Sequence, residues 1–129
     1  MSDHYAGRDE FVADCRLRIA TDLFTHTWDP VVLATLALGP HRRRELRVAI
    51  GGISDKVLTQ ALHRLLANGL ISRQAYPEAP PRVEYALTEL GQSLVDGPMN
   101  ALARWTLDHA DDLLDAQERA AKQPPSPIE

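Results

Sequence analysis

Residues 54–87 read SDKVLTQALHRLLANGLISRQAYPEAPPRVEYAL, and this stretch says most about the fold. Its first part has apolar residues at three- and four-residue spacing, which predicts an amphipathic helix that Ser54 caps and Gly69 ends. Two short strands are predicted behind the helix, over 70–76 and 82–87, joined by a proline-rich loop. A helix with such a hairpin behind it is typical of proteins that insert one rigid element into the DNA major groove.

Three further helices are predicted upstream. The first covers 9–24. The second begins after Asp29, which is expected to cap it, and is apolar on almost every side as far as Gly39. The third covers 42–50 and ends at a Gly-Gly pair directly before the capping serine. Two helices joined by a tight glycine-containing turn form a helix-turn-helix.

After the hairpin, Thr88 is expected to cap a helical region that reaches Ala121 and is kinked or split at Gly97-Pro98, because proline cannot donate the intrahelical bond. The predicted fold is mostly α with a small β-wing, a winged helix-turn-helix of order α-α-α-α-β-β-α. It forms a single domain over 1–121, followed by a disordered, proline-rich tail over 122–129.

The first and last helices have more apolar surface than one winged-helix core needs. A homodimer through these helices would cover it and would place two recognition helices about one DNA turn apart. Core packing is the competing interpretation for each large residue, and a ligand pocket is a further alternative for Trp105. The candidate dimer or ligand contacts are Phe11, Ile19, Trp28, Leu102 and Trp105.

The composition of the 129-residue chain is that of an ordinary globular domain, 44% apolar and 25% charged. It has no run of about 18 apolar residues, so no transmembrane helix is expected. The polar N-terminus is unlike a secretory signal, and a single cysteine excludes an internal disulfide framework. A cytoplasmic, nucleoid-associated protein is therefore expected.

Charge is unevenly distributed along the chain, whose net charge is −4. Between His41 and Glu84 there are eight basic and four acidic residues, whereas the remainder has six basic and fourteen acidic residues. A basic middle with acidic ends is the pattern of a local DNA-facing surface. The alternative is a solvated charge asymmetry without function.

The candidate DNA contacts follow from this arrangement. In the helix over 55–67, Thr59 and Gln60 can hydrogen-bond base edges, whereas the basic side chains can reach phosphate or guanine. The hairpin arginines are expected at phosphates or in the minor groove, and the basic residues of the third helix on the DNA backbone. An ordinary polar solvent face is the alternative for all of them. The full set is Arg42, Arg43, Arg44, Ser54, Lys56, Thr59, Gln60, His63, Arg64, Arg73 and Arg82.

Signals of catalysis or metal binding are weak. No two of the five histidines have ligand spacing on one helix, and no second cysteine could complete a zinc site. The sequence has neither a glycine-rich phosphate loop nor a GxSxG motif. We expect no enzyme, no cofactor and no metal. Cys15, on the apolar stripe of the first helix, is either a small buried hydrophobe or a thiolate that Arg16 and Arg18 stabilise.

The chain resembles the HxlR family of bacterial winged-helix regulators, which is close to MarR-type proteins. The resemblance covers about 13–107 and is most specific in ISxKxLTxxLxxLxxxGLIxR followed by PxRVEYxLTxxG. It implies a dimeric repressor or activator that binds a pseudo-palindromic operator as a homodimer. Some members sense electrophiles or oxidants through a cysteine near the N-terminus, and Cys15, thirteen residues before Trp28, lies where that cysteine falls.

Two alternatives accompany this resemblance. A small ligand between the C-terminal helices could replace the cysteine as effector. The chain could also be a winged-helix protein-interaction module that never touches DNA; such a module would not show the steep salt dependence of phosphate binding.

Overall fold

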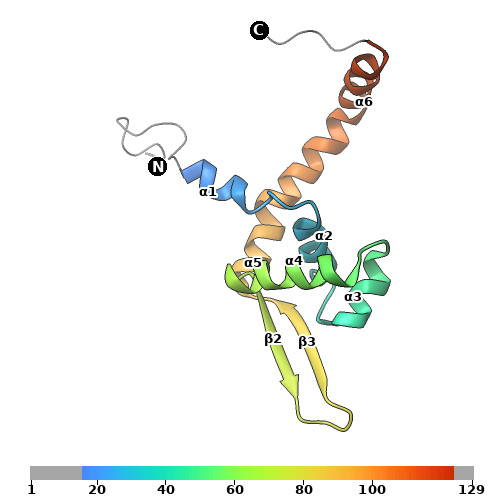
Figure 1. The fold of residues 1–129 in the computed structure, drawn as a ribbon. Coiled ribbons are helices and arrows are strands. Elements are labelled where there is room, and N and C mark those ends of the chain that lie inside the picture. The colour runs from blue at the N-terminus through green and yellow to red at the C-terminus, as the bar shows by residue number, and fades with distance from the viewer. Residues whose placement is uncertain (1–15, 124–129) are drawn as a thin grey trace. The chain divides into compact units, whose positions relative to one another are not determined.

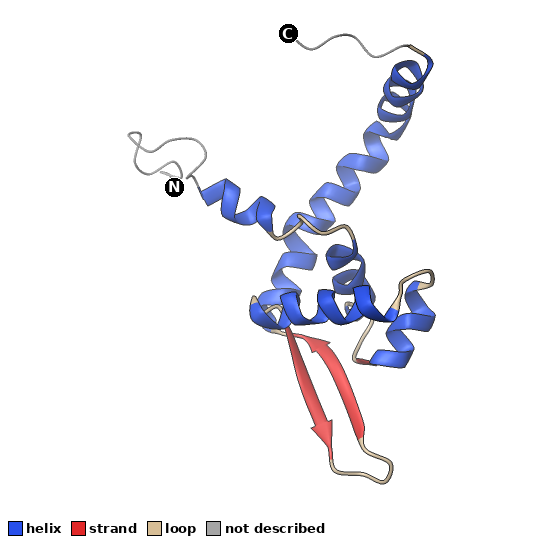
Figure 2. Ribbon diagram, in the orientation of Figure 1, coloured by secondary structure: helices blue, strands red, loops and turns tan. Residues whose placement is uncertain are grey.

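The computed structural model describes residues 16–123, and these are mostly helical with one small antiparallel sheet (Figures 1 and 2). The elements in chain order are α1 (Arg16–Asp22), α2 (Trp28–Leu36), β1 (His41–Arg42), α3 (Arg43–Ile50), α4 (Asp55–Ala67), β2 (Ile71–Tyr76), β3 (Arg82–Leu87), α5 (Glu89–Leu94), the π-helix η2 (Val95–Met99) and α6 (Asn100–Lys122). The chain divides into two compact units, Met1–Ser93 and Leu94–Glu129. A single domain over 1–121 therefore stays a prediction.

The core of the first unit is built from leucines and other aliphatic side chains of α2, α3, α4 and the start of β2. The stripe predicted on α4 is confirmed, since Leu58, Ala61, Leu62 and Leu65 are buried, and Leu66 is half-buried. Each fully buried leucine contributes about 1.5–3 kcal/mol relative to exposure. The other buried aliphatic residues are Val32, Leu33, Leu36, Leu46, Ile53, Leu70 and Ile71. This burial fixes which face of α4 remains free.

Both ends of α4 are as the sequence predicts. The Ser54 hydroxyl accepts a hydrogen bond from the Val57 backbone N–H at 3.1 Å, satisfying one of the free donors of the first turn. At the other end Gly69 has a φ of 72°, which favours glycine. Leu70 N–H donates to the Leu65 carbonyl, and Gly69 N–H to that of Leu66, both at 3.0 Å. These two bonds close α4 in a Schellman motif.

The wing, defined here as β2 and β3 with their loop, is also confirmed. The strands pair antiparallel from Ile71 opposite Leu87 to Tyr76 opposite Arg82. Thr88 then caps α5, because its hydroxyl accepts from Gly91 N–H at 3.1 Å and donates to the Gly69 carbonyl at 2.7 Å. The same threonine therefore ties the start of α5 to the end of α4.

Four expectations about the upstream elements were wrong or incomplete. The sheet has a third strand, β1, which pairs with β3 through His41 opposite Tyr85 and Arg42 opposite Glu84, giving the order β1-β3-β2. The helix predicted from 42 begins one residue later, because Arg42 belongs to β1. A two-residue strand is too short to show the alternation by which strands are predicted. Asp29 does not cap α2; it lies in the first turn and is buried. The described part of the first helix ends at Asp22, two residues before the predicted Phe24.

The second unit holds η2 and α6. The predicted break at Gly97-Pro98 is confirmed, since this segment forms a π-helical turn with Pro98 inside it. Helix α6 has no buried residue and exposes Leu102, Trp105, Leu107, Leu113 and Leu114. Trp105 stacks on His109 with ring centroids 4.7 Å apart. None of the helices within 16–123 combines the length and the apolar composition that a membrane span requires. The tail predicted over 122–129 lies mostly outside the described residues.

Candidate nucleic-acid interface

One face of α4 is polar and open to solvent. Lys56, Gln60 and His63 are exposed and lie four and three residues apart, so they line the face opposite the buried leucines. We call these three residues the α4 strip. Thr59 is half-buried, and its hydroxyl donates to the Asp55 backbone carbonyl at 2.9 Å, which leaves it less available than its neighbours. A lysine, an amide and an imidazole together can meet both phosphates and base edges.

An open hollow of about 660 Å³ lies beside the α4 strip. Residues 25–28, before and at the start of α2, line it together with Gln60, His63 and Arg64. Trp28, a predicted dimer or ligand contact, is therefore half-buried next to the α4 strip. The hollow leaves Gln60 and His63 accessible from the solvent side.

Arg64, a predicted DNA contact, is held by a buried carboxylate. Its Nε donates to Asp29 Oδ2 at 2.9 Å and its Nη2 to Oδ1 at 2.7 Å, a bidentate pair. The Asp29 side chain is only 5% exposed, and the Arg64 side chain is 30% exposed. The hydrogen bond raises the pKa of Arg64 and the charge of Asp29 adds to this effect, while burial opposes it. Arg64 thus anchors α4 to α2.

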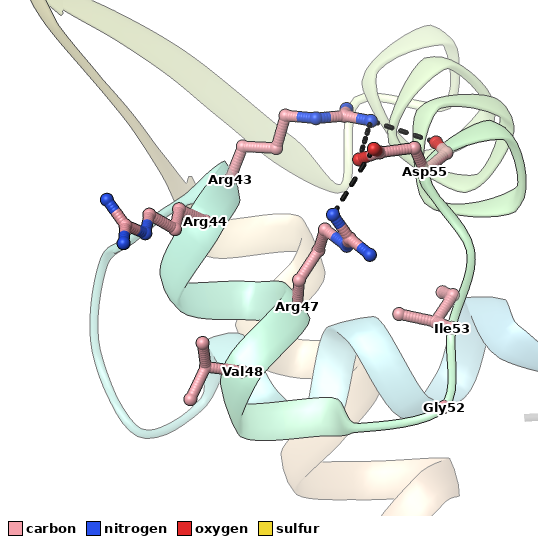
Figure 3. A pocket seen from close by; sticks show the side chains of 7 residues that line it. All are labelled: Arg43, Arg44, Arg47, Val48, Gly52, Ile53 and Asp55. Atoms are coloured by element: carbon pink, nitrogen blue, oxygen red, sulfur yellow. Dashed lines mark hydrogen bonds and ion pairs between the residues drawn. The ribbon is translucent and has the colours of Figure 1, made fainter.

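The predicted arginine cluster at the start of α3 is divided between two environments (Figure 3). Arg43 Nη2 lies 3.1 Å from Asp55 Oδ1 and 2.8 Å from the Asp55 carbonyl oxygen. Arg47, which was not among the predicted contacts, reaches Asp55 Oδ2 at 3.2 Å. Arg44 is exposed and points away from Asp55. These residues line a hollow of about 400 Å³ together with Val48, Gly52 and Ile53.

The two wing arginines, Arg82 and Arg73, also differ in whether a carboxylate holds them. Arg82 lies over the Tyr76 ring, 4.2 Å from its centroid, and pairs with Glu78 at 3.1 Å and Glu84 at 3.9 Å. Its side chain is 28% exposed, so its charge is largely balanced within the hairpin. Arg73 on β2 is exposed and forms no ion pair with any residue of 16–123. Arg73 is therefore the wing cation presented to solvent.

The remaining predicted residues are placed as follows. Arg42 is exposed, and its backbone N–H donates to Glu45 Oε1 at 2.8 Å. Ile19 on α1 is 67% exposed, and Trp105 on α6 is 50% exposed. Cys15 and Phe11 lie outside the described residues, so their predicted roles stay predictions. Within 16–123, no group of three His, Cys, Asp or Glu residues could hold a metal ion.

A helix-turn-helix with one face in the core, an exposed polar strip on its second helix and a hairpin with an exposed arginine define a winged helix-turn-helix of the DNA-binding class. The model of the HxlR-like helix-turn-helix family matches residues 23–113. The chain belongs to this family, whose members are DNA-binding transcriptional regulators.

The similar proteins are regulators as well. The HTH-type transcriptional regulator YtfH of Escherichia coli (strain K12) is 41% identical over 112 residues, which are 86% of this chain and 88% of YtfH. A MarR-family transcriptional regulator of Porphyromonas gingivalis W83 has a TM-score of 0.69 and 34% identity, covering 78% of this chain and 97% of that chain. The redox regulator HypR in its reduced form has a TM-score of 0.72 and 28% identity, covering 78% and 98%.

Proposed function

We propose that the chain binds a pseudo-palindromic operator as a homodimer, with the α4 strip of each copy in one of two successive major grooves. The observation that carries this proposal is that Lys56, Gln60 and His63 are exposed together on the helix whose opposite face forms the core. A helix anchored in this way can present base-reading groups rigidly, and the two-fold symmetry of a dimer fits a palindromic site.

Each exposed residue has a role in this proposal. Gln60 reads a base edge, since a glutamine amide can bond adenine in a bidentate way. Lys56, His63, Arg42, Arg44 and Arg73 contact phosphates and set the orientation of the protein on the duplex. Arg64 and Arg82 act within the protein, through Asp29 and through Tyr76 with its neighbouring glutamates, rather than on DNA.

The homodimer would use the apolar surface of α6, and that of α1. In α6, Leu102 is 59% exposed and Leu107 is 79% exposed, and in α1, Leu17 is 61% exposed. Exposed large apolar side chains of this kind are typical of protein interfaces. Sedimentation velocity of the intact protein tests this part: a dimer is expected at micromolar concentration, and Trp105→Ala should shift the equilibrium towards the monomer.

The effector proposal concerns Cys15. HypR, a structural neighbour, is a redox regulator, and this supports an oxidant or electrophile acting through Cys15. A non-covalent small ligand is the alternative. Diamide should release DNA from the wild-type protein and not from Cys15→Ser. Equal release from both proteins would assign the response to something other than this thiol.

The direct test of the DNA proposal is a salt titration. Each copy exposes four permanently charged candidates, Arg42, Arg44, Lys56 and Arg73. If two copies neutralise eight phosphates, log K should fall with log salt with a slope of about −7. A protein-interaction module would show little DNA binding even at low salt.

We infer that the chain acts by binding, not catalysis, and in the cytoplasm, where it would be associated with the nucleoid.

A further inference from the structure

The hollow of Figure 3 holds two arginines that share one carboxylate. Arg43 and Arg47, one helical turn apart on α3, both bond the side chain of Asp55, the first residue of α4. The arginine side chains are 37% and 46% exposed, and that of Asp55 is 65% exposed. The cluster is thus open to solvent and has a net charge of +1.

A DNA phosphate and the Asp55 carboxylate offer the same chemistry to a guanidinium. Both present paired anionic oxygens that accept charge-assisted hydrogen bonds. Asp55 directly precedes Lys56 of the α4 strip, and Arg44 points into solvent from the same helix that bears Arg43 and Arg47. A phosphate at this end of α4 would therefore meet two arginines that already hold an anion, and an aspartate that repels it.

The ion pairs of Asp55 are expected to add little to the stability of the fold. Solvent-exposed ion pairs contribute little to the stability of a protein. An acidic residue in the first turn of a helix gains a comparable amount from the helix dipole. Removing the charge of Asp55 is therefore expected to change the charge of this surface and to cost little stability.

We propose that Asp55 is an internal counter-charge that restricts phosphate binding by Arg43 and Arg47 and so lowers the sequence-independent affinity for DNA. This inference rests on the proposed DNA-binding face. The competing role, in which Asp55 orients the two arginines towards phosphate, predicts the opposite sign, because removing the carboxylate would then weaken binding.

The experiment compares Asp55→Asn with Glu89→Gln in the full-length protein. Both variants remove one negative charge from the first residue of a helix, but Glu89 forms no ion pair with any residue of 16–123. Binding to a random-sequence duplex is measured by fluorescence anisotropy from 50 to 300 mM salt. Asp55→Asn should steepen the slope of log K against log salt by about 0.9 per bound copy, and Glu89→Gln should not.

The same change can be stated as an affinity. If the titrations of wild type and Asp55→Asn converge near 1 M salt, the variant binds random DNA about eightfold more tightly per copy at 0.1 M salt. An unchanged slope, weaker binding or an equal gain in Glu89→Gln would overturn the inference. If the wild-type protein bound no DNA, the proposed function would fail as well; a wild type that binds while Asp55→Asn has an unchanged slope refutes the counter-charge alone.

A second pair of variants leaves Asp55 in place, so it does not depend on the folding of Asp55→Asn. Arg44→Gln should reduce the salt slope by about one per copy, whereas Arg47→Gln should reduce it much less, because Asp55 already restricts phosphate binding at the shared Arg43–Arg47 cluster. In the Asp55→Asn background the effect of Arg47→Gln should rise to that of Arg44→Gln. Equal losses in the presence of Asp55 would overturn the proposal.

Discussion

Replacing Arg64 by alanine should destabilise the protein strongly, although its side chain reaches the surface. The change leaves the Asp29 carboxylate, 5% exposed, without the two charge-assisted bonds of 2.9 and 2.7 Å. Removing one partner of a buried ion pair costs about 3–5 kcal/mol. Because Arg64 itself is 30% exposed, water can enter the vacated space, and we expect the lower end, about 3 kcal/mol.

Urea unfolding of the intact protein, followed by circular dichroism at fixed protein concentration, measures this cost. Asp29→Ala should be milder, about 1–2 kcal/mol, because the half-exposed guanidinium it leaves can be hydrated. In Asp29→Ala with Arg64→Ala, the two losses should not add, which gives a coupling of more than about 1 kcal/mol. The control is Arg44→Ala, which removes an exposed arginine and should change stability by less than about 0.5 kcal/mol. A cost below about 1 kcal/mol for Arg64→Ala, or additive losses, would refute the anchoring role.

Three further predictions concern the packing of α5, base reading and the wing. Gly91→Ala should destabilise the fold by about 1–3 kcal/mol, because the added Cβ would meet the backbone carbonyl of Leu70. Gly97→Ala, whose Cβ would meet nothing within 4 Å, should not, and equal urea midpoints for the two variants would contradict the packing argument. Gln60→Ala should weaken operator binding by about 1–3 kcal/mol and leave random-duplex binding nearly unchanged; equal losses in anisotropy titrations would count against base reading. Arg73→Ala should lower the salt slope by about one per copy, whereas Arg82→Ala should mainly lower the urea midpoint, and the reverse assignment would contradict the described wing.

The parts of the fold that depend on local signals could be predicted from the sequence. Ser54 caps α4 and Gly69 ends it because capping and left-handed backbone are decided within a few residues. The periodicity of the leucines identified the buried face of α4, and so the α4 strip. The break at Pro98 follows from a missing N–H, which is equally local.

Partner choice among charged residues could not be predicted. Arg64 looks like a DNA contact in sequence, but its partner Asp29 lies 35 residues away and is unlike a buried residue by type. Arg82 is bound by glutamates of its own hairpin, and Arg43 by an aspartate twelve residues later. The sequence does not reveal whether the charge of an arginine is paired, so only the folded chain distinguishes the exposed Arg42, Arg44 and Arg73 from the arginines that are held by carboxylates.

The strand β1 shows the same limit for the backbone. Its two residues belong to a run of basic residues that continues into α3, and no alternation can be recognised over two positions. The pairing with β3 is set by the tertiary contact, opposite Tyr85 and Glu84. A strand of this length is visible only once the rest of the sheet is in place.

The central claim is that the α4 strip faces DNA, and the two lysines of the chain allow a direct test. Lys56 lies in the α4 strip and Lys122 at the end of α6, and the chain has no other lysine. Their acetylation rates can be followed by mass spectrometry, with and without a saturating duplex. We predict that DNA slows the acetylation of Lys56 severalfold and leaves that of Lys122 unchanged. Equal reactivity of Lys56 in the free and fully bound protein would contradict the claim.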